Sequence, residues 1–329
     1  MITHEQLGFL FDGIQPGAFV LRAQPHSLLI PGHHWLWQSF YPTHQTLLAQ
    51  GHTSEHDLAH LPADLKQTYL IGSRHKHENR ALMATLAAKF SNGSTLTTLL
   101  PNDLGAKSLE ADLKQLFGPE NVITSSKHHA RRMVATYTTE INSVLLNEWL
   151  NLYTPAKHVE GTFYTQPGIF SWQAVDEGSR LLAEHLPTNL HGQSADLGAG
   201  WGYLTYHLLA KNPGLQVDLY EAEALALNCA KLNLAQYGHQ CQYHWADATK
   251  LPAGKTYDLI ITNPPVHDLH NSDVGLGVAF VQQALQHLNR KGQLYIVANR
   301  HLPYEALLKG YSMHTLAQTN QYKIIHAQR

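Results

Sequence analysis

The sequence predicts an α/β protein that consists of two consecutive α/β domains. A chain of 329 residues suggests about two domains. Apolar residues make up 43% of the chain, which is enough for ordinary hydrophobic cores. In both halves, apolar runs of strand length alternate with segments of helical spacing, and this alternation favours parallel sheets. We place the two domains at residues 1–155 and 156–329.

The first half shows this alternation with few sequence motifs. Apolar runs at residues 27–30, 68–71 and 95–100 are expected to be buried strands. Residues 79–90 carry apolar side chains at helical spacing, and a second helix is expected at 109–117. No Gly-x-Gly-x-Gly turn follows any of these strands, so we expect this domain to bind no cofactor.

The second half repeats the alternation after a connecting segment at residues 151–165. A helix is expected at 176–185, and a strand from Ala195 leads through a glycine-rich turn into a helix that ends near Lys211. The other expected elements are strands at 216–220, 242–245, 258–262, 292–298 and 322–327, and helices at 222–237 and 279–288. Two halves with similar organisation suggest an ancient duplication in which only the second half kept the glycine turn.

The charge balance excludes a globally basic nucleic-acid-binding protein. The formal net charge is −2, and only 15% of the residues are charged. Any contact with RNA must therefore use a local patch. The candidates are Lys127, Arg131 and Arg132 within one basic segment, the basic segment 74–80, and Arg300 in the second half.

Cysteine and histidine usage argues against disulfides and metal sites. Cys229 and Cys241 provide neither a disulfide framework nor a zinc spacing, which fits a reducing compartment. The 24 histidines are scattered and form no His-Glu-x-x-His motif, so we expect no bound metal. The N-terminus has no signal-peptide pattern, and no apolar run approaches the roughly 18 residues of a membrane span. We therefore expect a cytoplasmic protein.

Residues suited to cofactor binding follow three successive strands of the second half. The glycines of a Gly-x-Gly-x-Gly turn allow a sharp bend and a close approach of ligand to backbone. A carboxylate after the second strand can accept hydrogen bonds from ribose hydroxyls, and one after the third can accept from an adenine amino group. Parallel strands end at one edge, so these residues form one crevice. They are Asp196, Gly198, Gly200, Gly202, Glu221 and Asp247.

A polar residue and two prolines follow the fourth strand of the same crevice, in the order Asn263-Pro264-Pro265-Val266. Proline fixes its own φ and pushes the preceding residue to extended geometry, so this loop is stiff. The Asn263 side-chain oxygen and the Pro264 carbonyl can accept the hydrogens of an NH2 group, which leaves the nitrogen lone pair free to attack an electrophile. No strong base is needed, because the nitrogen can lose its proton after it has bonded to the electrophile.

The chain resembles the two-domain bacterial ribosomal RNA guanine-N2 methyltransferases that modify 16S rRNA, with the 23S rRNA enzyme as a close relative. The resemblance covers most of the chain. It rests on Tyr164-x-x-Pro-Gly-Ile-Phe-Ser171, Asp176-x-Gly-Ser179, the segments 196–202 and 263–268, the segment 292–304, and Tyr322-Lys-Ile324. Lys76-x-Glu78 and Asn102-x-x-Gly-Ala-Lys-Ser108 extend it weakly into the first half.

This resemblance implies two tandem class I methyltransferase-like, Rossmann-like domains. The first has lost cofactor binding and helps to engage RNA. The second binds S-adenosylmethionine and transfers its methyl group to the exocyclic N2 of a guanosine in 16S rRNA, with 23S rRNA as the alternative. The implied partner is ribosomal RNA or the small ribosomal subunit. The implied catalytic residues are Asn263, Pro264, Pro265 and Val266.

Val266 departs from the family, which usually has a phenylalanine that stacks on the target base. Such stacking contributes about 1–3 kcal/mol per base. Another aromatic side chain can substitute, and the candidates are Tyr203, Phe170 and Tyr304. Two other hypotheses stay open: methylation of protein glutamine or adenine N6, whose loops usually carry Tyr or Phe at this position, and a non-catalytic RNA-binding relative.

Overall fold

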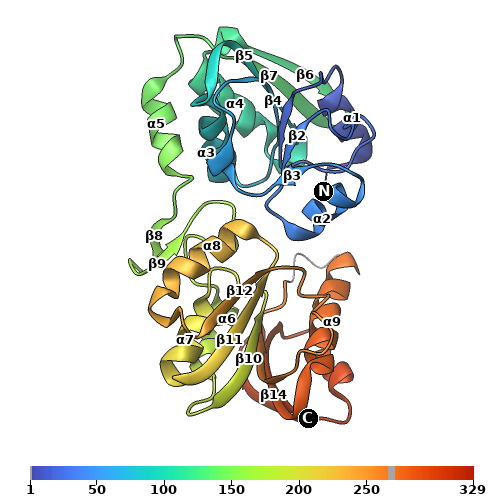
Figure 1. Cartoon of the computed structure of the whole chain (residues 1–329), viewed down its shortest axis with the longest axis vertical. Coiled ribbons are helices and arrows are strands. Elements are labelled where there is room, and N and C mark those ends of the chain that lie inside the picture. The colour runs from blue at the N-terminus through green and yellow to red at the C-terminus, as the bar shows by residue number, and fades with distance from the viewer. Residues whose placement is uncertain (1, 266–270) are drawn as a thin grey trace. The chain divides into compact units, whose positions relative to one another are not determined.

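The structure, a computed structural model, describes residues 2–265 and 271–329 (Figure 1). It divides into two compact units. The first unit contains the chain up to Pro155 together with Gln166–Gly168, and the second contains Ala156–Thr165 and Ile169–Arg329. Each unit is built on its own seven-stranded sheet.

The sheet of the first unit has the strand order β3-β2-β1-β4-β5-β7-β6. The pairs are parallel from β3 to β5, whereas β7 is antiparallel to both β5 and β6. In chain order the strands are β1 (Phe19–Leu21), β2 (Trp35–Trp37), β3 (Ser54–Glu55), β4 (Leu65–Ile71), β5 (Phe90–Pro101), β6 (Val122–Lys127) and β7 (Ala130–Thr136). The helices are α1 (His4–Phe11), α2 (Tyr41–Ala49), α3 (Lys76–Ala87), α4 (Ala106–Phe117) and α5 (Ser143–Asn151).

The sheet of the second unit has the order β12-β11-β10-β13-β14-β16-β15. Its strands are β10 (His191–Leu197), β11 (Gly214–Glu221), β12 (Cys241–Trp245), β13 (Tyr257–Thr262), β14 (Leu288–Asn299), β15 (Ser312–Gln318) and β16 (Tyr322–Gln328). The helices are α6 (Glu177–Glu184), α7 (Tyr203–Lys211), α8 (Ala224–Asn233) and α9 (Asn271–Gln286). A hairpin of β8 (Ala156–Val159) and β9 (Phe163–Thr165) precedes them. Short 3-10 turns lie at Leu58–His60, Asn102–Leu104, Pro119–Asn121, Ala235–Tyr237 and Tyr304–Leu308.

The second sheet is covered on both faces. Alternate residues of its strands join a buried cluster with Phe280, Val281 and Ala284 of α9. Successive strand residues point to opposite faces. Asp196 is absent from that cluster and instead accepts a hydrogen bond from Thr205 of α7. Helix α7 therefore covers the face opposite α9, and it contacts α6 and α8.

The predicted α/β class with two Rossmann-like sheets is confirmed, but several predicted elements are wrong. Residues 27–30 form a turn rather than a strand: the Leu29 amide donates to the His26 carbonyl at 3.0 Å, and Leu29 is buried within that turn. Phe90 begins β5 instead of ending a helix. Each sheet ends in two antiparallel strands, so neither is purely parallel. Strands of three residues, such as β1 and β2, are too short to show periodicity.

Candidate functional site

Four adjacent parallel strands of the second unit bring the predicted site residues to one edge of the sheet. β12, β11, β10 and β13 pair in parallel in that order, so their carboxyl ends lie together. The glycine turn follows β10, and Glu221 is the last residue of β11. Asp247 follows β12, and Asn263 follows β13. The glycine turn, Glu221, Asp247 and Asn263 therefore lie at one edge of the sheet.

The three glycines of the turn are not equivalent in their surroundings. All three have positive φ, at 74° for Gly198, 55° for Gly200 and 85° for Gly202. A Cβ on Gly198 would lie 3.1 Å from the Phe280 ring, and one on Gly202 would lie 3.0 Å from Leu234. A Cβ on Gly200 would meet no heavy atom of the described chain within 4 Å. Packing therefore requires two of the glycines, whereas Gly200 borders open space.

Asp196 is a fully buried carboxylate at the carboxyl end of β10. Its Oδ2 accepts a hydrogen bond from the Thr205 hydroxyl at 2.7 Å. Its Oδ1 is buried and has no hydrogen-bond partner within the described residues. Burial raises the pKa of Asp196 to about 7, the Thr205 hydrogen bond opposes this shift, and nearby Glu221 adds to it. An unsatisfied buried acceptor is costly, so it indicates a missing donor or cation.

Glu221 is held in place by the backbone of the crevice. Its Oε2 accepts from the Gly200 amide at 2.8 Å, and its Oε1 accepts from the Glu223 amide at 2.7 Å. Burial raises the pKa of Glu221, and these amides partly oppose the shift. Each carboxylate oxygen has a further lone pair, so Glu221 can still accept hydrogen bonds from a diol.

Asp247 lies in the loop after β12 and also makes local contacts. Its Oδ1 accepts from the amide and the hydroxyl of Thr249 at 2.9 and 2.6 Å. Lys250 lies 3.5 Å from its Oδ2. These contacts fix the loop and place a third acid at the edge that also carries Asp196 and Glu221. The edge is therefore suited to a ligand that carries positive charge and hydrogen-bond donors.

Asn263 lies at the same edge with its amide nitrogen fully engaged. Nδ2 donates to Asp176 Oδ2 at 3.0 Å and to the Ser179 hydroxyl at 2.8 Å. No described residue donates a hydrogen bond to its Oδ1. The side chain therefore presents an acceptor with no donor among the described residues, beside the buried Pro264 and the half-buried Pro265. Val266 lies outside the described residues.

Asp176 and Ser179 were absent from the predicted site, because they precede Asn263 by 87 and 84 residues. Asp176 caps α6 by accepting from the Ser179 amide at 2.8 Å. The segment Asp176-x-Gly-Ser179 carried part of the family resemblance, and that was the signal that could have identified them.

The three aromatic residues suggested as replacements for the stacking ring differ in exposure. Tyr304 is 1% exposed and Tyr203 is 8% exposed, whereas Phe170 is 57% exposed. The Phe170 carbonyl accepts from the Trp201 indole at 3.2 Å, which ties it to the glycine turn. Phe170 is therefore the candidate of the three that has an accessible ring.

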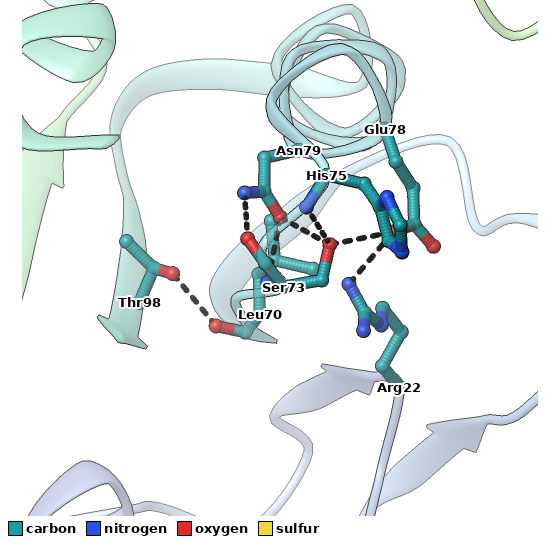
Figure 2. Close-up of polar contacts among 7 residues, drawn as sticks. All are labelled: Arg22, Leu70, Ser73, His75, Glu78, Asn79 and Thr98. Atoms are coloured by element: carbon teal, nitrogen blue, oxygen red, sulfur yellow. Dashed lines mark hydrogen bonds and ion pairs between the residues drawn. The ribbon is translucent and has the colours of Figure 1, made fainter. Parts of the chain in front are cut away.

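At the equivalent edge of the first unit, polar side chains form hydrogen bonds with one another (Figure 2). The Ser73 hydroxyl donates to Glu78 Oε2 at 2.6 Å, and Arg22 Nη1 donates to the same oxygen at 3.2 Å. Asn79 accepts from the Ser73 amide at 2.9 Å and donates to its carbonyl at 2.6 Å. Arg22, Ser73, Glu78 and Asn79 thus serve as hydrogen-bond partners within this edge.

The predicted RNA-contact residues do not form one free cluster. Arg131 pairs with Glu110 of α4, whereas Arg132 donates to the carbonyls of Leu10 and Asp12 at 3.3 and 3.1 Å. Lys127 is exposed and has no ion pair among the described residues. Arg300, after β14, is likewise exposed and unpaired within the part that the structure describes. Within the basic segment 74–80, Lys76 and Arg80 both pair with Asp112.

Two features are absent from the residues that the structure describes. None of the helices described is long and apolar enough to cross a membrane. Within the same residues, no group of three His, Cys, Asp or Glu side chains is arranged to hold a metal ion. Cys229 and Cys241 are both buried, and neither forms a disulfide within the described residues.

Comparison with known proteins places the chain in a family. Residues 160–326 match the family model described as methyltransferase small domain. Ribosomal RNA small subunit methyltransferase C of Psychromonas ingrahamii is 31% identical over 259 residues, which cover 76% of this chain and 72% of that protein. The protein of the same name from Vibrio vulnificus is 31% identical, with 77% and 74% covered.

A solved structure extends the similarity to the whole fold. The 16S rRNA N2 methyltransferase of T. thermophilus, solved in complex with AdoMet and guanosine, matches with a TM-score of 0.81 at 22% identity. The match covers 99% of this chain and 91% of that chain. Sequence and fold agree, and the chain belongs to the ribosomal RNA small subunit methyltransferase C family of methyltransferases with the small domain.

Proposed function

We propose that this protein methylates the exocyclic N2 of a guanosine in 16S rRNA with S-adenosylmethionine as the methyl donor. The observation that carries the proposal is the Asn263 amide. Its nitrogen is fixed by Asp176 and Ser179, so its oxygen, which accepts from no described residue, is the acceptor at this edge of the sheet. An acceptor at this position suits a target that carries an amino group.

The residues of the crevice fit S-adenosylmethionine, which supplies an activated methyl group on a sulfonium when it is bound. Asp196 Oδ1, which has no partner among the described residues, suits a cationic or hydrogen-bond-donating group. The open space at Gly200 allows a ligand to approach the backbone closely. Glu221 supplies acceptors for ribose hydroxyls, and we assign Asp247 to the adenine amino group.

The reaction requires positioning of the target amine rather than a strong base. The Asn263 oxygen and the Pro264 carbonyl accept the two N2 hydrogens, which directs the nitrogen lone pair toward the methyl group. The nitrogen forms the new bond to carbon while the bond from carbon to sulfur breaks. The proton then leaves the nitrogen to solvent. The base must be unpaired or flipped out of its helix to reach this site.

We infer a division of labour between residues 1–155 and 156–329, in which the first part engages RNA and binds no cofactor. Support comes from the edge shown in Figure 2, where Arg22 and Ser73 both donate to the Glu78 carboxylate. Lys127 and Arg300 are exposed cations without ion pairs among the described residues, and we assign them to phosphate contacts. The substrate is ribosomal RNA or the small subunit, so we place the activity in the cytoplasm.

Nucleoside analysis of ribosomal RNA tests the proposal. Cells that lack the gene should have lost one N2-methylguanosine from 16S rRNA, and the purified protein with S-adenosylmethionine should restore it. Loss from 23S rRNA instead would reassign the substrate. Unchanged N2-methylguanosine in both RNAs, together with no transfer in vitro, would refute the proposal.

A further inference from the structure

The first turn of α6 is connected directly to the reactive loop after β13. One oxygen of Asp176, Oδ2, accepts both the Ser179 amide at 2.8 Å and the Asn263 side-chain nitrogen at 3.0 Å. The same carboxylate therefore caps the helix and holds the site amide. Hydrogen bonds to an ionised carboxylate are stronger than neutral ones, so this contact constrains the Asn263 side chain effectively.

Ser179 completes the constraint. Its hydroxyl accepts from Asn263 Nδ2 at 2.8 Å, so both hydrogens of that nitrogen are engaged. Ser179 is buried, at 9% exposure, and lies on the third residue of α6. A flipped amide would place its oxygen against the Asp176 carboxylate, which cannot donate when ionised. One orientation of the amide is therefore strongly favoured.

The packing of α6 on the sheet sets the position of these two groups. A Cβ on Gly178 would lie 3.0 Å from the Tyr322 ring and 3.1 Å from Asp176 Oδ2. The helix contacts β14 and β16, and Tyr322 is the first residue of β16. The glycine therefore permits the close approach that brings Asp176 and Ser179 to Asn263.

We propose that Asp176 and Ser179 are positioning residues that fix the polarity of Asn263. Because they occupy the nitrogen, the target meets an oxygen that accepts hydrogen bonds and cannot donate them. The site then selects an exocyclic amino group over a carbonyl such as the O6 of guanine. This inference rests on the proposed function, since it assigns the cause of that function's amine specificity.

A double-mutant cycle tests this role in the full-length protein. Asp176→Ser removes the carboxylate but keeps a residue that caps helices well. Ser179→Ala removes the hydroxyl and introduces a residue with high helix propensity. Each is measured alone and together with Asn263→Ala. We expect kcat on 16S rRNA to fall about tenfold for each single variant, as for the loss of one hydrogen bond to a charged or buried partner. Affinity for S-adenosylmethionine, measured by calorimetry, should not change.

The combination with Asn263→Ala separates positioning from general damage. If Asp176 and Ser179 act through Asn263, neither substitution should lower kcat further in the Asn263→Ala protein. Asn142→Ser and Ser143→Ala provide matched controls, because Asn142 caps α5 in the first unit and Ser143 begins that helix. Both controls should keep wild-type kcat, and thermal unfolding should show that all variants are folded.

The outcomes distinguish this inference from the proposed function. Equal losses of kcat in the presence and absence of Asn263 would overturn the positioning role while leaving guanosine methylation intact. A wild-type protein that transfers no methyl group to guanosine would overturn the proposed function and the inference together. Reduced cofactor affinity in Ser179→Ala would assign Ser179 to the cofactor site and also contradict the inference.

Discussion

The two sheets have the same strand order, but the side chains at their carboxyl edges differ in charge and polarity. Strands β3-β2-β1-β4-β5-β7-β6 of the first correspond in order and direction to β12-β11-β10-β13-β14-β16-β15 of the second. Both sheets also shift register at the same place, between Leu65 and Gln67 in β4 and between Tyr257 and Leu259 in β13. This correspondence supports the duplication suggested by the sequence.

Strand register aligns the two edges residue by residue. Leu21 pairs with Trp37 and Leu70, as Leu197 pairs with Tyr220 and Thr262. The aligned pairs at the edge are therefore Val20 with Asp196, Arg22 with Gly198, Gln38 with Glu221 and Ile71 with Asn263.

Gln38 and Glu221 show how the chemistry changed while the geometry remained. Gln38 Oε1 accepts from the amide two residues later at 2.9 Å, as Glu221 Oε1 does at 2.7 Å. The second terminal atom of the two side chains differs. Gln38 Nε2 donates to the Ala23 carbonyl at 2.9 Å, whereas Glu221 Oε2 accepts from the Gly200 amide. The aligned positions thus share one backbone contact, but Gln38 carries a donor where Glu221 carries a second acceptor.

The largest effect should come from substitution of Asn263, whose aligned position in the first unit is the apolar Ile71. We expect Asn263→Ala to lower methyl transfer by about 10²–10³, the usual loss when one preorganised polar group is removed from a reacting centre. Cofactor affinity should stay nearly unchanged. Single-turnover assays on an rRNA fragment measure the rate. Asn289→Ala is the control, because Asn289 also donates to a carboxylate but lies at the amino end of β14. A wild-type rate in Asn263→Ala would eliminate the amine-gripping mechanism.

The glycine turn should show the next largest effect. Gly200→Val places a side chain in the space beside the turn, and we expect cofactor affinity to fall about tenfold or more, equivalent to roughly 1.4 kcal/mol. Gly254→Val is matched for backbone strain, because Gly254 also has a positive φ and open space around its Cβ position. Calorimetry should show normal binding in that control. Equal affinities in the two variants would remove Gly200 from the cofactor site.

The buried acid of β10 should make the stability of the protein depend on pH. The pKa of Asp196 is about 7 in the folded protein, whereas an unfolded Asp titrates near 3.9. Between these values the folded state holds more protons, so stability should fall as pH rises from about 4 to about 7, with a slope approaching 1.4 kcal/mol per pH unit. Asp196→Asn keeps an acceptor for Thr205 and removes this titration. Urea unfolding across that range checks the difference, and parallel pH profiles would contradict it.

Substitution in the Arg22–Glu78 pair of the first unit should change stability and leave cofactor binding unchanged. Glu78→Gln weakens the ion pair with Arg22. The Arg22 side chain is 23% exposed and the Glu78 side chain is 14% exposed. We expect unfolding to become easier by about 1 kcal/mol, the upper end for exposed pairs. Asp64→Asn, which breaks the exposed pair with Lys66, should cause no measurable change. A change in S-adenosylmethionine affinity in Glu78→Gln would show that this edge still serves a cofactor.

The smallest effect should come from the first unit's contact with RNA. Lys127→Ala should weaken binding of an rRNA fragment severalfold and reduce the slope of log affinity against log salt by about 1. Lys66→Ala is the control, because Lys66 is exposed but already paired with Asp64. Filter binding at several salt concentrations measures both quantities. An unchanged slope would mean that Lys127 touches no phosphate.

The sequence by itself determined the α/β class and which residues gather at the catalytic edge. Side chains at the carboxyl ends of parallel strands must meet, so Glu221, Asp247 and Asn263 could be grouped from chain order alone. Family motifs added the substrate class that geometry alone could not give.

Only the tertiary structure decided which polar groups are free to act. Arg131 and Arg132 looked like a cationic patch, but neighbouring positions on β7 point to opposite faces, where each has partners within the protein. Asp176 reaches Asn263 across 87 residues of chain, and no local spacing encodes that contact. Asp196 Oδ1, which has no partner among the described residues, likewise depends on burial beneath α7, whose Thr205 donates to the other oxygen. Local pattern fixes where a side chain lies along an element, whereas long-range packing fixes what it touches and therefore what remains to bind a ligand.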